Sequence, residues 1–382
     1  MKKLLLAATL AAATPALAGP NDILVGLDSK IEYTDRGQTN VTPGTDKLLV
    51  LDVSNPGLPK IRATLDLANS LLGPPTNLQI TPNGRLGLLA NSVVHNADGA
   101  GWKLAPDDKL FVVDLDATPP KLIDTVTVGK QPSGLAISRD GKLVLIANRA
   151  GKSVSVLSID GTTVKHLSDV DLGQEVAAVA ITPDGKRALA AMNVVGKMAV
   201  LAIDGQTVTY DKANDIPVGA NPYNVDITPD GKFAIVGNTG GGKDNADPLT
   251  TIALTGAHPH ITGLTTAGAG PEGMAISPDG KYFVTPLLLG TSGMKSDYFY
   301  GRHGQAVLAS IGSDGGIKVL DRAVLGGLPE GVAFSRDSRY VYIGNYIDKT
   351  LQVFSITRNT LQPHGLPIAL PGQPASMRGL AR

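Results

Sequence analysis

A short hairpin phrase recurs six times along the chain and limits the folds that it can adopt. Each copy has an alternating strand, a turn of the Pro-Asp-Gly type and a second strand. Proline presets φ in such a turn, and glycine accepts the positive φ that closes it. The copies lie 44 to 58 residues apart, at residues 78–85, 135–142, 179–186, 225–232, 274–281 and 332–339.

The spacing of the copies predicts an all-β, seven-bladed β-propeller. Four short strands fill each shorter interval, which is the content of one propeller blade. A seventh copy is split between the two ends of the chain. Residues 375–380 form an inner strand with nothing after it, whereas residues 23–27, 47–52 and 60–65 form three strands with no inner strand before them. Joining one strand to three closes the ring and removes its exposed edges.

The composition agrees with a chain of short strands and excludes several partners. Gly 45 and Pro 26 suit tight turns, and no segment keeps a 3.6-residue apolar period. No cysteine is present, so the core alone must hold the fold. Lysine plus arginine and aspartate plus glutamate both number 34, so no overall field favours nucleic acid or an anionic membrane.

The first 18 residues have the pattern of a secretory signal. Lys2 and Lys3 precede an apolar run over residues 4–13, and Ala16 and Ala18 form an A-x-A cleavage site. We expect cleavage after Ala18, a periplasmic or secreted protein, and one propeller domain over residues 19–382. No later segment has about 18 uninterrupted apolar residues, so no membrane insertion is expected.

The ends of the second strands resemble a known repeat. They read Leu-Ala-Asn at 89–91, Ile-Ala-Asn at 146–148, Val-Gly-Asn at 236–238 and Ile-Gly-Asn at 343–345, and strands such as residues 153–157 follow. This pattern resembles the YVTN-repeat β-propeller family, within the WD40/YVTN-like superfamily. The resemblance implies the fold shared with the seven-bladed lactonase-like propellers, but the repeat is structural and implies no catalytic residue.

Four long connections between second and third strands are predicted on the top face, where inner strands begin. They span residues 28–46, 92–108, 239–248 and 287–305, in blades seven, one, four and five. These blades form two neighbouring pairs, so we expect two walls around a cleft at the channel mouth. The alternative is that the connections are solvated insertions. They carry Glu32, Tyr33, Asp35, Arg36, His95, Trp102, Lys243, Asp244, Lys295, Asp297, Tyr298, Tyr300, Arg302 and His303.

The alternation of the inner strands predicts which residues face the channel. Leucine, isoleucine and valine positions face the blade core, so the residues between them face the axis. Asp226 and Arg378 are the two charges in that lining, and they either bind a polar ligand or form a structural plug. Glu175, Glu272 and Glu330 precede inner strands at the mouth. The ligand-binding candidates are Asn77, Gln79, Trp102, Asn224, Asp226, Glu272, Tyr298, Tyr300, Glu330 and Arg378.

The motifs of several enzyme classes are missing from the sequence. It has no GxSxG elbow, no P-loop and no EF-hand loop, and its single tryptophan cannot dock blades as in quinone-dependent propellers. The His258-Pro259-His260 segment has metal-like spacing, but a turn is favoured over a zinc site because no third ligand is near in sequence. We therefore expect no metal and no cofactor.

Three functions remain open at this stage. The first is a monomer that binds a small molecule or a protein partner at the top-face channel mouth. The second is a lactone hydrolase of the 6-phosphogluconolactonase type in the same cleft. His95 and His303 would then activate water, and Arg302 or Arg378 would hold the oxyanion. The third is an interaction scaffold that uses the rims of the blades.

Overall fold

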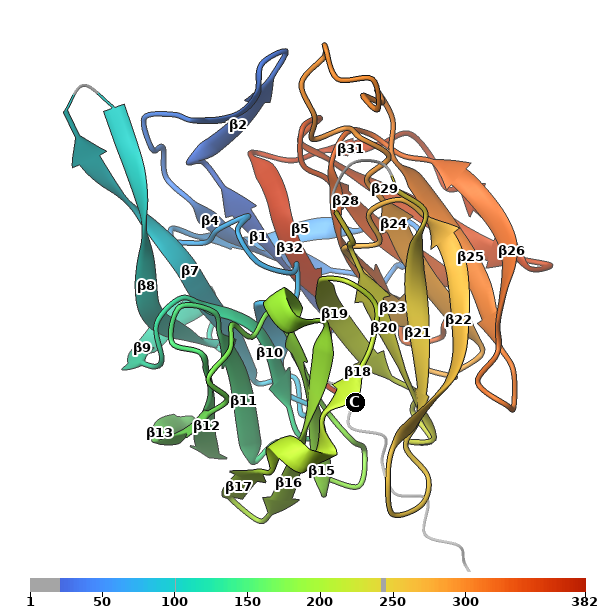
Figure 1. Cartoon of the computed structure of the whole chain (residues 1–382). Coiled ribbons are helices and arrows are strands. Elements are labelled where there is room, and N and C mark those ends of the chain that lie inside the picture. Colours follow the sequence, from blue (N-terminus) through green and yellow to red (C-terminus); the bar gives the residue numbers. More distant parts are fainter. Residues whose placement is uncertain (1–20, 100, 242–244) are drawn as a thin grey trace, which may run out of the picture.

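The computed structural model describes residues 21–99, 101–241 and 245–382. Seven antiparallel sheets surround a central axis, as the hairpin repeat predicts (Figure 1). No α-helix occurs in these three ranges, where the helical elements are the 310 turns η1 (Asn193–Val195) and η2 (Lys212–Asn214). The prediction of an all-β, seven-bladed propeller is confirmed.

In blades one to six, four strands run outward from the axis in chain order. Blade one contains β6 (Leu78–Ile80), β7 (Leu86–Asp98), β8 (Gly101–Asp114) and β9 (Lys121–Thr127). Blade two contains β10 (Pro132–Ile137), β11 (Leu143–Asn148), β12 (Ser153–Asp160) and β13 (Thr163–Asp171). Blade three contains β14 (Val179–Ile181), β15 (Arg187–Met192), β16 (Lys197–Asp204) and β17 (Thr207–Tyr210), with β18 (Ile216–Pro217) beside β16. Blade four contains β19 (Pro222–Ile227), β20 (Phe233–Asn238), β21 (Asp247–Ala253) and β22 (His260–Gly268). Blade five contains β23 (Ala275–Ile276), β24 (Tyr282–Leu287), β25 (Gln305–Ile311) and β26 (Ile317–Val324). Blade six contains β27 (Pro329–Phe334), β28 (Tyr340–Asn345), β29 (Thr350–Thr357) and β30 (Thr360–Pro363), with β31 (Ile368–Ala369) beside β29.

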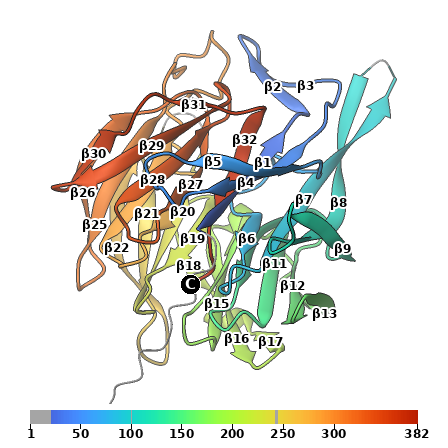
Figure 2. The ribbon, with the colours of Figure 1, turned by 180° about the vertical axis from the view of Figure 1, so that it is seen from behind.

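The two ends of the chain complete blade seven. The inner strand β32 (Gln373–Arg378) pairs with β1 (Asp22–Asp28), and β4 (Lys47–Asp52) and β5 (Lys60–Leu65) follow outward (Figure 2). Leu24 pairs with Arg378 and Val25 with Met377. The predicted joining of one strand to three therefore closes the ring.

The repeated turn is held by its own side chains. In blade three, the Thr182 hydroxyl donates to the Asp184 carboxylate at 2.6 Å, and that carboxylate accepts the amide N–H of Lys186 at 3.0 Å. Gly185 has φ of 68°, where a Cβ would be strained. Burial acts to raise the pKa of Asp184, but these bonds together with the charges of Arg187 and Lys186 outweigh it, so the pKa is lowered. The turn lies on the bottom face, where its Pro183 helps to line the lower end of the channel.

The asparagine that ends the second strand is a structural latch. The Asn148 amide donates to the hydroxyls of Ser153 at 3.0 Å and Ser155 at 2.9 Å, on the third strand of the same blade. Asn238 and Asn345 make equivalent bonds in blades four and six. The motif that resembles the YVTN repeat thus stabilises the blades and leaves the top face free for other residues.

Apolar side chains fill the spaces between neighbouring blades. Leu145 and Val156 of blade two, for example, pack with Ala190 and Leu201 of blade three, and all four are inaccessible to solvent. Each of the seven blade interfaces has such a cluster. An eighth apolar cluster covers part of the top face, where the buried Ile31, Leu328 and Tyr346 meet.

Two of the predicted loops are ordered hairpins instead. β7 and β8 stay paired far beyond their blade, out to Asp98 and Gly101, and project from the top face (Figure 1). β2 (Ile31–Thr34) and β3 (Gly37–Asn40) form a second hairpin beside them. Each connection contains a turn residue that closes a hairpin, Gly99 with φ of 59° and Gly37 with φ of 83°.

Candidate functional site

Two glutamates lie at the top end of the channel, here called the upper mouth. Glu330 is near the start of β27, and Glu272 precedes β23. Glu272 and Glu330 each lie between a proline and a glycine. A Cβ on Gly273 would lie 2.0 Å from the Glu330 carbonyl oxygen, and one on Gly331 would lie 2.4 Å from the Met377 nitrogen. The glycines therefore let adjacent inner strands approach closely, which brings the two glutamates towards one another.

Burial and mutual repulsion keep protons on this glutamate pair. Glu330 is 2% exposed, and its Oε2 has no hydrogen-bond partner among the described residues. Burial, followed by the charge of Glu272, raises the pKa of Glu330 well above its ordinary value. Burial also raises the pKa of Glu272 to about 7, against the lowering effects of the Arg149 charge and the Tyr223 hydroxyl. The pair therefore holds at least one proton near neutral pH.

An arginine and two tyrosines from other blades surround the pair. The Arg149 guanidinium lies 5.9 Å from the centre of the Tyr223 ring, and its Nε is buried without a partner in the described part of the chain. Burial, followed by the charge of Glu272, raises the pKa of Tyr223. Burial, followed by the charges of Glu330 and Glu272, raises that of Tyr33. We call Arg149, Tyr223, Glu272 and Glu330 the upper-mouth cluster.

A cavity of about 270 Å³ opens beside Glu272, between the top connections of blades four and five. Its wall combines polar side chains with exposed backbone at glycines. This volume is close to the lower limit for small-molecule sites, which suits a compact ligand. The lining includes Asn221, Thr239, Asp247, Gly270, Glu272 and Leu288.

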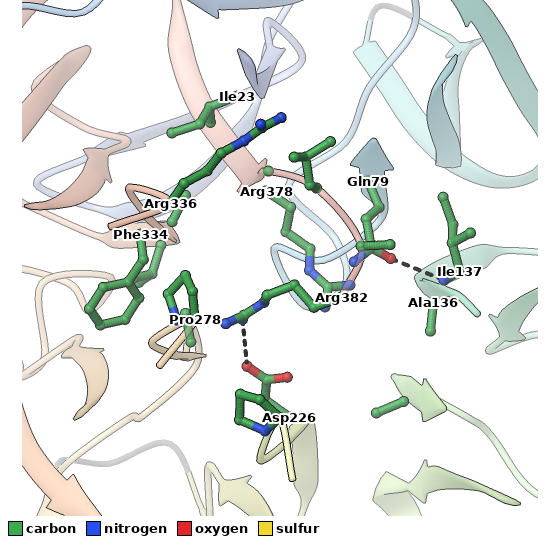
Figure 3. A pocket seen from close by; sticks show the side chains of 18 of the residues that line it. Ile23, Gln79, Ala136, Ile137, Asp226, Pro278, Phe334, Arg336, Arg378 and Arg382 are labelled. Atoms are coloured by element: carbon green, nitrogen blue, oxygen red, sulfur yellow. Dashed lines mark hydrogen bonds and ion pairs between the residues drawn. The ribbon is translucent and has the colours of Figure 1, made fainter. Parts of the chain in front are cut away.

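A second cavity, of about 240 Å³, occupies the bottom end of the channel, here called the lower mouth (Figure 3). The channel-facing positions predicted from strand alternation line it: Gln79, Ala136, Ala180, Asp226, Ala275, Ala333 and Arg378. Asp226 and Arg378 do not pair directly. Arg378 donates to the Leu135 carbonyl at 2.8 Å, and the ion pair of Asp226 is with Arg382 at 3.7 Å.

Two predicted candidates hold the backbone at the top of the inner strands. The Asn77 amide donates to the Asn69 side chain at 2.8 Å and to the Ala90 carbonyl at 2.7 Å. The Asn224 amide donates to the Glu272 carbonyl at 3.2 Å. Both asparagines are buried, so they hold the backbone of the upper mouth in place. Asn224 fixes the segment that carries Glu272.

The histidines expected to activate water lie on separate elements. His95 stacks on Trp102 with ring centres 6.0 Å apart, and the Trp102 indole donates to the Thr42 hydroxyl at 3.3 Å. His303 is exposed, as is the neighbouring Arg302. In the described ranges no hydrogen bond or ring contact joins His95 to His303, so their catalytic pairing stays a prediction without a supporting contact.

The remaining top-face candidates link the predicted walls. Lys295 bonds to Asp35 through its backbone N–H at 3.0 Å and its side chain at 3.3 Å, so the β2–β3 hairpin joins blade seven to the blade-five connection. Tyr298 is 89% exposed and Tyr300 half-buried on that connection. Lys243 and Asp244 lie outside the described residues.

The sequence interpretation missed Arg149 and Tyr223, although a signal for both was present. Tyr223 follows Pro222 as Glu272 follows Pro271, so it occupies the same position of an inner strand. Arg149 follows the latch Asn148 directly, where the second strand ends on the top face. Comparing these positions between blades would have identified both residues.

Searches for a metal site and a membrane span give no candidate in the residues that the structure describes. No group of three or more histidine, aspartate or glutamate side chains is placed to hold a metal ion. No helix there is both long and apolar enough to cross a bilayer. His258 and His260 lie at the turn between β21 and β22, where the His260 ring approaches the His258 carbonyl at 3.3 Å.

Comparison with known proteins supports the fold alone. Neither a family model nor a curated protein matches the sequence. Among solved structures, a candidate 6-phosphogluconolactonase from Bacteroides fragilis is 17% identical with a TM-score of 0.72, and the match covers 96% of this chain and 99% of that one. The periplasmic gluconolactonase PpgL from Pseudomonas aeruginosa is 18% identical with a TM-score of 0.67, and the match covers 94% and 98%.

Proteins of other kinds share the architecture as well. Hydrazine synthase from Kuenenia stuttgartiensis is 20% identical with a TM-score of 0.58, and the match covers 76% of this chain and 79% of that one. One fold therefore carries unrelated activities, and the site must decide the function. The chain is a seven-bladed β-propeller whose structural neighbours include lactonase-like propellers.

Proposed function

We propose that the protein binds a small, neutral, hydroxylated molecule at the upper mouth. The observation that carries this proposal is the buried Glu330 carboxyl, whose Oε2 has no hydrogen-bond partner among the described residues. Leaving a buried polar atom without a partner costs free energy. Glu272 lines the cavity of about 270 Å³ whereas Glu330 does not, so we infer that a ligand in the cavity extends past Glu272 and that one of its hydroxyls supplies the missing bond.

The chemistry of the upper-mouth cluster indicates the class of ligand. Arg149 and Tyr223 offer donors, a protonated Glu330 offers a donor and an acceptor, and Glu272 accepts when ionised. Such a mixed set suits the hydroxyls of a sugar or of a sugar lactone. A strongly anionic ligand would be repelled by the glutamate pair. The cavity of about 270 Å³ limits the ligand to a compact molecule.

Thermal unfolding with a panel of monosaccharides and sugar lactones tests this proposal. A ligand at 100 times its Kd stabilises the folded state by about 2.7 kcal/mol. We expect a rise in Tm that Glu330→Gln and Tyr223→Phe reduce. The matched control Glu175→Gln changes a glutamate on the same face of blade three that neither lines the cavity nor acts on the pKa of Glu272 or Glu330. The proposal fails if no compound raises Tm, or if all three variants respond like the parent protein.

A second candidate function, lactone hydrolysis, is favoured by the pKa of Glu272. A carboxylate with a pKa of about 7 suits general-base activation of water at neutral pH. Arg149 faces it and offers a cation for the developing oxyanion. The Pseudomonas aeruginosa neighbour is described as a gluconolactonase. These residues replace the histidines as candidates for the reaction.

Hydrolysis of sugar lactones, measured above the spontaneous rate at pH 6 to 8, separates the two functions. If the protein is a hydrolase, Glu272→Gln lowers kcat by about 10²-fold or more, as expected for loss of a general base. His95→Ala and His303→Ala then leave the rate within about twofold of the parent. A protein that binds lactones without turnover supports the binding function alone.

We further propose that the protein is exported and acts as a monomer outside the cytoplasm. The predicted signal at residues 1–18 lies outside the described residues, and the periplasmic location of the Pseudomonas aeruginosa neighbour supports the proposal by analogy. Cell fractionation and amino-terminal sequencing test it, with the mature chain expected to begin at Gly19. Recovery of the uncleaved chain from the cytoplasm would contradict it.

A further inference from the structure

The lower mouth brings together three arginines at one cavity. Arg336 follows the inner strand of blade six, Arg378 ends the inner strand of blade seven, and Arg382 lies on the segment that follows (Figure 3). Strand alternation predicts that Arg378 lies there. Arg336 reaches the cavity from the turn after the inner strand of blade six, and Arg382 reaches it from the carboxyl-terminal tail. Guanidinium groups in such a number at one small cavity indicate an anionic ligand.

Arg378 has most of its hydrogen-bonding capacity unused. A guanidinium has five N–H donors. In the described structure the bond of Arg378 is to the Leu135 carbonyl, at 2.8 Å. Burial, the largest effect, lowers the pKa of this guanidinium although the charge of Asp226 raises it. An anion in the cavity would offset the cost of holding the cation away from water.

Gln79 offers further donors beside Arg378. Its Oε1 accepts the amide N–H of Ile137 at 3.0 Å, which fixes the orientation of the amide group. The NH2 end has no partner in the described ranges and belongs to a side chain that lines the cavity. Leu135 and Ile137 lie two residues apart on β10, so Arg378 and Gln79 are held by the same strand.

The carboxyl-terminal tail holds Arg382 at the cavity. Ile80 fixes the tail by donating to the Gly379 carbonyl at 3.1 Å and by accepting the Ala381 N–H at 2.8 Å. Arg382 then lies 3.7 Å from Asp226, a separation too long for a hydrogen bond. The Asp226 carboxylate is already held by the N–H groups of Ile227 and Ile276, at 2.9 and 2.8 Å. Arg382 is therefore free to turn towards a stronger acceptor.

The charged side chains of the lower mouth fall into two groups. Asp22 pairs with Arg62 at 2.5 Å, and its charge also acts on Arg336. Asp226 lies 3.7 Å from Arg382, and its charge also acts on Arg378. The three side chains of the second group therefore carry one net positive charge. Apolar side chains such as Ile181, Ile227 and Phe334 make up much of the remaining wall, which strengthens the attraction for an anion.

We propose that the lower mouth is a binding site for the anionic group of a small metabolite, a carboxylate or a phosphate. Arg378 and Arg382 bind the oxygens, and Gln79 donates one further hydrogen bond. This site is separate from the upper-mouth cluster and does not depend on the function proposed for it. Asp226 favours ligands that carry a hydroxyl or an amine next to the anionic group.

Isothermal titration of the purified protein at low ionic strength tests the proposal, with inorganic phosphate, citrate and gluconate as probes and chloride as the control anion. We expect saturable binding of at least one probe at millimolar or lower concentration. Arg382→Gln and Arg378→Gln should each weaken it about tenfold or more, as expected for a charge-assisted bond. Comparing phosphate with the two carboxylates identifies the preferred group.

The control variant is Arg139→Gln, which changes an exposed arginine of a bottom-face turn outside the cavity. It should bind like the parent protein. If Arg378→Gln does not fold, Arg382→Gln decides, because the Arg382 side chain is partly exposed. The proposal is overturned if no probe binds, or if the Arg382 variant binds as tightly as the Arg139 variant.

Discussion

Stability should fall as pH rises through the ionisation of the upper-mouth glutamates. The pKa of Glu272 is about 7 in the folded protein, against 4.5 for the same group in water. The folded state holds this proton more tightly than the unfolded chain, so stability is lost between those two pKa values and stays lost above them. One pKa unit corresponds to ~1.4 kcal/mol, so ionising Glu272 costs the folded state about 3 kcal/mol.

Glu272→Gln removes this cost because glutamine is a neutral isostere of the protonated acid. The variant should match the parent protein at pH 4 and exceed its free energy of unfolding by about 3 kcal/mol at pH 8. It should also lower the pKa of Glu330, since the Glu272 charge contributes to raising it. Glu330→Gln should add stability mainly at the alkaline end of the range.

Urea unfolding followed by circular dichroism at pH 4.5, 6, 7 and 8 measures the difference. Subtracting the variant from the parent cancels the titration of the other carboxyls. Glu175→Gln serves as the matched control, and its curve should run parallel to that of the parent protein. Equal pH dependence of the parent and Glu272→Gln between pH 5 and 8 would refute the buried, proton-holding pair.

Three further changes test the fold. Asn148→Ala deletes a buried latch with two hydrogen bonds to the third strand and should cost about 1 to 3 kcal/mol in urea unfolding. Lys30→Met leaves the buried carboxylates of Asp28 and Asp46 without their cation and should cost about 3 to 5 kcal/mol at pH 7. That cost should shrink in acid, where protonation of Asp28, whose pKa burial already raises, relieves the charge. A chain ending at Gly372 lacks β32, so light scattering should show aggregation through the exposed edge of β1; a soluble monomer would contradict the closure.

The fold could be predicted from the sequence because each blade repeats the same local chemistry. A proline, an aspartate and a glycine define one turn, and apolar alternation on both sides defines two strands. The split of blade seven could be predicted by counting strands, because the three strands near the amino terminus need an inner strand from the carboxyl-terminal segment. Even the channel-facing side chains Gln79, Asp226 and Arg378 follow from a period of two.

Residues outside the repeat could not be placed in the same way. The β7–β8 extension carries turn chemistry at Gly99, but its length depends on packing against the neighbouring β2–β3 hairpin, where the Asn40 amide donates to the Trp102 carbonyl at 3.3 Å. Arg382 reaches the channel because Ile80 bonds to the tail on both sides. Both features arise from contacts between segments far apart in the sequence, which strand periodicity does not report.

The two mouths can evolve separate chemistries because each inner strand places its ends in different surroundings. Glu330 and Phe334 belong to one inner strand, yet Glu330 joins the carboxyl pair above and Phe334 lines the arginine cavity below. Glu330 and Phe334 are four residues apart, which is about 13 Å at ~3.3 Å per residue. That separation exceeds the Debye length at physiological ionic strength, which is ~8 Å, and no lower-mouth arginine contributes to the pKa shift of either glutamate. Neutralising an arginine below should therefore leave the pKa of the pair above almost unchanged.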